Sequence, residues 1–137
     1  MGKAFIAKLS GANGNYIWGH AYSTDFSTQT PVGLAFDGQG NLAVAGYFDG
    51  TVDFGNGSGV LSALGSDGFV VKLSASSGTT MWSKRMGGTG TDFIHGVACD
   101  SASDVIVTGE TPGGDFNGTP LTTLGSNDAF LVKIGGQ

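Results

Sequence analysis

The chain has 137 residues, and 26 of them are glycine, more than twice the usual share of about 7%. Six basic and eleven acidic residues give a net charge of −5, which disfavours nucleic-acid binding because that function needs a basic surface. Ten of the acids are Asp, which favours turns over helices. No segment approaches the ~20 apolar residues of a membrane helix. We therefore expect an all-β protein without nucleic-acid binding or membrane insertion.

An internal repeat organises the chain. A motif of the form Phe-x-x-Lys-Leu/Ile occurs three times, at residues 5–9, 69–73 and 130–134. Three further motifs occur twice in the same order: an aromatic motif at 15–18 and 79–82, a second at 33–37 and 96–100, and a third at 41–46 and 104–109. The connecting pieces also match, at 53–54 with 115–116 and 64–66 with 124–126. The repeat is about 61–64 residues long.

Each motif is a short run rich in Val, Ile, Phe, Tyr or Trp between Gly, Asn, Asp or Ser, which is typical of strands and turns. Segments 37–41 and 100–104 predict hairpin loops, as do 10–14 and 74–78. One unit is thus a four-stranded antiparallel meander with a Gly-rich loop at 49–66 or 111–127. We expect a single module over 1–137, with repeat one at about 5–68, repeat two at about 69–129 and a partial third repeat at 130–137.

Strands at 42–45 and 105–107 are apolar without alternation, so both of their faces should be covered. Tandem four-stranded units of this kind suit the blades of a β-propeller, which pack face to face around an axis. Packing should bury Phe69 and Phe130 with Val71 and Val132. The glycines that end equivalent strands, Gly46 and Gly109, should mark a bulge, a positive φ or a close backbone approach.

Several motifs together resemble the bacterial SBBP β-propeller repeat. They are Gly-Thr-Thr-x-Trp-Ser-Lys-Arg at 78–85, Gly-Gly-Thr-Gly-Thr-Asp at 87–92, and the segments at 96–100 and 105–109. The resemblance implies inner strands at 33–37 and 96–100, then 41–47 and 104–110, then the Phe-x-x-Lys strand, with the Trp strand outermost. It also implies an extracellular or cell-surface protein, although residues 1–3 lead into a strand pattern without a signal peptide. The first unit departs from the repeat around Trp18 and over the loop at 23–31.

The sequence predicts little chemistry, no enzyme and no cofactor. No Gly-x-Ser-x-Gly or phosphate-binding loop is present, and one cysteine excludes an internal disulfide. His95 follows Asp92 closely, but we interpret it as a loop histidine; Cys99 aligns with Phe36, interpreted as a core position. The loops at 37–41 and 100–104 lack the ligand pattern of an EF-hand, so no metal site is predicted. A looser calcium site near Asp49 and Asp53 remains an open alternative.

We expect a non-enzymatic structural or interaction scaffold, with surface proteins or glycans among its conceivable partners. The alternative is a glycan-binding propeller lectin that uses four aromatic residues as sugar platforms: Trp18, Tyr22, Tyr47 and Trp82. Against this alternative, Trp18 and Trp82 occupy equivalent strand positions, where a repeated aromatic residue is more often a packing residue.

The partner that we predict first is a second copy of the chain. Nine strands are expected, beginning with a Phe-x-x-Lys strand and a Trp strand and ending with an inner pair and a surplus Phe-x-x-Lys strand. Two units cannot close a propeller of four to eight blades, so we expect head-to-tail strand exchange into a ring of three or four chains, or an open fibre. The residues expected to form the core or support assembly are Phe5, Trp18, Phe69, Trp82 and Phe130. A monomeric nine-stranded sandwich is the alternative, and deleting residues 1–22 should abolish assembly.

Overall fold

The computed structural model describes residues 3–22, 27–55, 57, 59–116 and 118–135, and this part of the chain is all-β. It contains no helix long and apolar enough to cross a membrane. The strands are β1 (Ala4–Leu9), β2 (Tyr16–Tyr22), β3 (Thr28–Phe36), β4 (Leu42–Val52), β5 (Leu61–Leu73), β6 (Thr80–Gly87), β7 (Phe93–Cys99), β8 (Val105–Thr111), β9 (Gly114–Phe116), β10 (Thr119–Leu121) and β11 (Asp128–Ile134).

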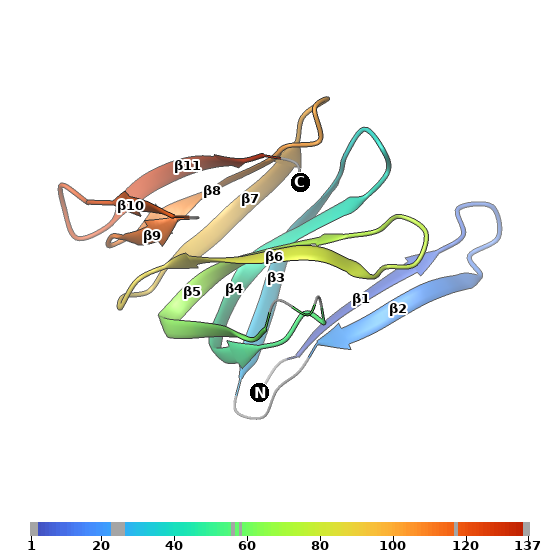
Figure 1. Cartoon of the computed structure of the whole chain (residues 1–137), viewed down its shortest axis with the longest axis horizontal. Helices are drawn as coiled ribbons and strands as arrows, with labels where there is room; N and C mark the ends of the chain where they lie inside the picture. The colour runs from blue at the N-terminus through green and yellow to red at the C-terminus, as the bar shows by residue number, and fades with distance from the viewer. Residues whose placement is uncertain (1–2, 23–26, 56, 58, 117, 136–137) are drawn as a thin grey trace.

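These strands form three open sheets, and the hairpin β1–β2, the strands β3 to β6 and the strands β7 and β8 follow one another across the molecule in chain order (Figure 1). The N-terminal hairpin consists of β1 and β2. The central sheet has the order β10-β9-β6-β5-β4-β3, and the C-terminal sheet has the order β11-β8-β7. All strand pairs within these sheets are antiparallel. The order β3-β4-β5-β6 is that of the meander expected for one repeat.

Two expectations about strand limits were wrong. The segment 49–66 is not simply a loop, because β4 continues to Val52 and β5 begins at Leu61. The segment 111–127 contains β9 and β10, so the described residues form eleven strands rather than nine. Burial explains both differences, since Val52 and Phe116 are fully enclosed in apolar clusters. Because β9 pairs with Met86 and Gly87 at the end of β6, the Trp strand is not the edge of the central sheet there. The loop expected at 23–31 lies partly outside the described residues, and β3 takes up residues 28–31.

Two apolar cores separate the three sheets. The first lies between the N-terminal hairpin and the central sheet, and it includes Ile6, Trp18, Val44 and Phe69. The second lies between the central and C-terminal sheets and includes Ala43, Val70, Trp82, Val107 and Phe130. Strands β4 and β5 therefore contribute to both cores, which explains why their apolar residues do not alternate with polar ones.

The two strand-ending glycines confirm the predicted close approach. A side chain at Gly46 would overlap the carbonyl of Thr30, and one at Gly109 would overlap the carbonyl of Phe93 and the ring of Phe130. The pairing register shifts opposite both glycines, between Pro31 and Gly33 and between Ile94 and Gly96. The strand opposite each glycine therefore bulges toward a position where only glycine leaves room.

Candidate assembly surface and ion-pair sites

The repeated lysine of the Phe-x-x-Lys motif forms a buried ion pair in the central sheet. Lys72 Nζ lies 2.8 Å from Asp37 Oδ2, with both side chains almost fully enclosed, and it donates a second hydrogen bond to the carbonyl of Ser103 at 2.7 Å. Burial raises the pKa of Asp37, but hydrogen bonds from Lys72, Asn41 and Gln39 outweigh it and lower the pKa to about 2. The Asp37 loop is thus held to β5 by a charge that stays ionised.

The equivalent lysine in the C-terminal sheet is paired with two carboxylates. Lys133 Nζ lies 2.6 Å from Asp100 Oδ2 and 2.8 Å from Asp104 Oδ2. The hydrogen bonds to Asp100 and Asp104 raise the pKa of Lys133. The pKa of Asp100 is lowered, above all by its hydrogen bond from Lys133. Asp100 also accepts hydrogen bonds from the amides of Ala102 and Asp104, so it caps the hairpin loop that the sequence predicts over 100–104.

Lys8, the first of the three equivalent lysines, differs from the other two. Its ammonium group donates to the carbonyl of Ala75 at 2.7 Å. Within the described residues, no carboxylate lies within ion-pair distance of it. The repeat therefore supplies an acidic loop to Lys72 and Lys133 but not to Lys8.

A second buried charge cluster was missed by the sequence analysis. Arg85 Nη1 lies 2.5 Å from the buried carboxylate of Asp67. Burial raises the pKa of Asp67, and Arg85 opposes this effect. Nearby, the carboxylate of Asp92 accepts hydrogen bonds from the Thr111 hydroxyl and the Gly88 amide. The turn at 87–92 is therefore built around buried carboxylates, and the alternation of Gly, Thr and Asp in it was the available signal.

Large apolar side chains are exposed beside β1 and β3. Phe5 is 67% exposed, Leu34 59% and Phe36 61%. Two grooves, of about 380 and 230 Å³, run between β1 and the strands β3 and β4. The interpretation of Phe36 as a core residue was therefore wrong, because no strand of the described chain covers this face of β3. Phe5 likewise lies outside both cores.

The other residues expected in the core are buried. Phe69 and Val71 are enclosed in the first core, and Phe130 in the second, with Val132 partly buried against it. Each phenylalanine faces the sheet that precedes its own along the chain. Phe5 has the same place in the repeat, and it is exposed because no sheet of the described residues lies on that side.

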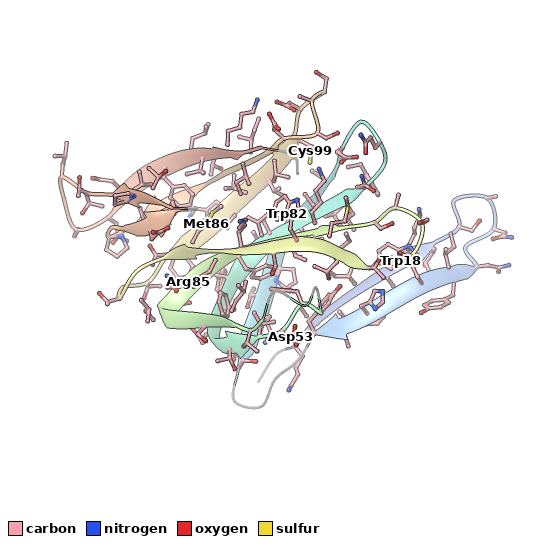
Figure 2. All side chains as sticks on the ribbon, viewed as in Figure 1. Trp18, Asp53, Trp82, Arg85, Met86 and Cys99 are labelled. Carbon is pink, nitrogen blue, oxygen red and sulfur yellow. The ribbon has the colours of Figure 1, made fainter. Side chains whose placement is uncertain are left out.

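The four candidate sugar-platform aromatics do not gather in one place. Trp18 and Trp82 are buried in the first and second cores respectively (Figure 2). Tyr47 packs edge-on against Phe93. Tyr22 is buried against Phe54 but also lines a groove of about 340 Å³ together with His20, Ala21, Asp53, Phe54, Gly55 and residues 78–80.

The indole nitrogens of the two tryptophans have different surroundings. Trp18 Nε1 donates to the carbonyl of Ala75 in the β5–β6 loop at 3.3 Å. Trp82 Nε1 is buried and has no hydrogen-bond partner in the described part of the chain. Buried donors are nearly always paired, so the surroundings of Trp82 differ from those of Trp18.

The remaining candidate residues lie in different surroundings. His95 does not pair with Asp92. The His95 side chain is exposed and lies 3.6 Å from Glu110, whereas Asp92 is buried and accepts a hydrogen bond from the Thr111 hydroxyl. Cys99 is only partly buried, and burial raises the pKa of its thiol. Asp53 caps the Gly55 amide. No cluster of three or more metal-ligating His, Cys, Asp or Glu side chains occurs among the described residues.

Comparison of the chain with models of known protein families and with curated protein sequences finds no match.

Proposed function

We propose that the chain is a non-enzymatic scaffold built from propeller-type repeats, which assembles head to tail with further copies of itself at a bacterial cell surface. The observation that carries the proposal is the exposure of Leu34 and Phe36. Their equivalents in the second repeat, Val97 and Cys99, pack against the central sheet. The first repeat therefore presents an apolar face with the pattern of a buried interface but without its cover.

The other end of the molecule offers a complementary face. Within the chain, Val97 and Cys99 of β7 pack against the small residues Gly33 and Ala35 of β3. A side chain at Gly33 would contact Val97, and the Ala35 carbonyl faces the Cys99 thiol. Their equivalents on β7, Gly96 and Ala98, lie in the C-terminal sheet. Small residues on β7 of one copy would thus receive Leu34 and Phe36 of the next, as β3 receives β7 within the chain. Such a contact uses different surfaces on the two copies, and it closes into a ring or continues as a filament.

The test is the replacement Leu34→Asp, followed by light scattering at micromolar concentration. We expect the unmodified protein to be oligomeric and the variant to be monomeric, because the new carboxylate would be desolvated in the contact. Leu124→Asp is the matched control, since Leu124 is fully exposed in the β10–β11 loop. Equal masses for the two variants would contradict the proposal.

The groove at Tyr22 favours one second candidate, a glycan-binding protein. His20, Tyr22 and Asp53 bring aromatic and carboxylate groups to the lining of this groove. A glycan array tests it, with the expectation that any binding is lost in Asp53→Ala. If the protein binds no glycan on the array, the glycan-binding function is excluded and the scaffold function stands alone.

A further inference from the structure

This inference rests on the proposed self-assembly and concerns how the chain is held before it assembles. Strands β1 and β11 carry the same motif, and both have one unpaired edge in the described chain: β1 pairs only with β2, and β11 only with β8. In the central sheet, the equivalent strand β5 pairs on both edges, with β4 and β6. Strand β1 thus lacks the neighbour that β4 provides, and β11 lacks the neighbour that β6 provides.

The motif allows β1 to replace β11 on β8 residue for residue. In the present register, Phe130 lies opposite Gly109 and Lys133 opposite Ile106. With β1 in the same register, Phe5 would lie opposite Gly109 and Lys8 opposite Ile106. Phe5 would then reach the space beside Gly109 that the ring of Phe130 now fills. One β8 edge cannot hold both strands.

The charges agree with this replacement. Asp100 and Asp104 form a site for one lysine, which Lys133 now occupies at 2.6 and 2.8 Å. Lys8 has the equivalent place on β1 and no carboxylate in contact within the described residues. Moving Lys8 of another copy onto this loop would give it the pairing that Lys72 has with Asp37.

The unpartnered indole of Trp82 supports the same arrangement. Trp18 Nε1 bonds to the carbonyl of Ala75, in the loop that follows the Phe-x-x-Lys strand of the adjacent sheet. If β1 of a second copy joined β8, the loop after β1 would come beside Trp82 in the same way. Gly11 of that loop has the place of Ala75 in the repeat, so its carbonyl would accept a hydrogen bond from Trp82 Nε1, which has no partner among the described residues. The adjoining β2 would cover the open edge of the sheet.

We propose that β11 is an internal placeholder for β1 of a second copy. In the free chain, β11 closes the edge of β8, and Lys133 occupies the Asp100–Asp104 site. On assembly, β1 of the second copy displaces β11, and Lys8 replaces Lys133. The exchange makes assembly a competition between an intramolecular and an intermolecular strand of nearly the same sequence.

The first experiment reverses charges in the full chain. Lys8→Glu should weaken assembly at least about tenfold in light scattering, because the new carboxylate at position 8 would face Asp100 and Asp104. A second variant, Asp100→Asn with Asp104→Lys, keeps the loop cap and repels Lys8, so it should also fail to assemble alone. Mixing the two variants should restore assembly, since each then meets an opposite charge. Lys3→Glu is the control, because it makes the same charge change two residues before the Phe-x-x-Lys motif. It is a suitable position, since the equivalent positions in the repeat already hold acidic residues, Asp67 and Asp128.

The second experiment measures hydrogen exchange of the unmodified chain before and after assembly. The amides of β1 should gain protection, and those of β11 should lose it. Lys133→Glu, which loosens β11, should strengthen assembly at least about tenfold.

The outcomes separate the two proposals. If the unmodified chain and all variants are monomeric, self-assembly itself is overturned. If the chain assembles but β11 stays protected and the charge-reversed pair shows no mutual rescue, the placeholder is overturned and the scaffold stands. Rescue in the mixture together with loss of β11 protection supports both.

Discussion

The central and C-terminal sheets contain the same Phe-x-x-Lys motif in two different settings. In the central sheet, Val70, Val71 and Lys72 of β5 are all enclosed, because a sheet lies on each side. In the C-terminal sheet, Leu131 of β11 is 69% exposed, although it is equivalent to Val70. The comparison shows that the motif defines the strand and its inward face, whereas burial of the outward face depends on the next sheet in the stack.

We expect the largest loss of stability from removing a core side chain between two sheets. Phe69→Ala should lower the free energy of unfolding by about 3–5 kcal/mol, because it removes an aromatic ring that packs against Phe48 and Phe54. Leu131→Ala in β11 should change it by less than about 0.5 kcal/mol in the monomer. Urea unfolding at a fixed low protein concentration compares the two. Equal losses would show that the two sheets are packed alike.

The next effect concerns the glycines opposite the strand bulges. Gly109→Val should cost about 3 kcal/mol, since its side chain would collide with the Phe93 carbonyl and the Phe130 ring. Thr108→Val, at an exposed neighbouring position, should change the stability by less than about 0.5 kcal/mol. Thermal unfolding of both variants checks this. Equal melting temperatures for Gly109→Val and Thr108→Val would contradict this explanation.

A pH effect separates the two ion-pair sites. The pKa of Asp37 is lowered in the folded protein to about 2, so its contribution is present above the unfolded value of about 3.9. That contribution, about 2 kcal/mol, should be lost as the pH falls from about 4 to about 2. Asp37→Asn should flatten this part of the stability curve, whereas Asp100→Asn, at the more exposed Lys133 site, should leave it nearly unchanged. An unaltered acid profile in Asp37→Asn would contradict the assignment.

The smallest effect is expected on the outer face of the C-terminal sheet. His95 and Glu110 form an exposed contact at 3.6 Å, and such pairs contribute little. His95→Ala should therefore change the free energy of unfolding by less than about 0.5 kcal/mol. A larger loss, measured in urea, would mean that this face is already covered in the single chain.

The sequence was sufficient to predict the repeat, the meander β3-β4-β5-β6 and the close approaches at Gly46 and Gly109, because these follow from local pattern and strand-ending glycines. The exposure of Phe36 could not be predicted, since a strand pattern does not tell whether a neighbouring sheet covers the strand. The added strands β9 and β10 were missed because their Gly-rich segments resemble loops until Phe116 is seen in the core. Likewise, nothing in the spacing of Arg85, Asp67 and Asp92 indicates that two buried carboxylates lie close together and that Arg85 pairs with one of them.

The mass of the unmodified chain in solution tests the central claim most directly. Multi-angle light scattering over a range of micromolar concentrations should give a mass of three or four chains, or a distribution that grows with concentration if the assembly is a fibre. A single species of 13.8 kDa throughout that range would contradict the account, because Leu34, Phe36 and the free edge of β1 would then face water in the stable protein.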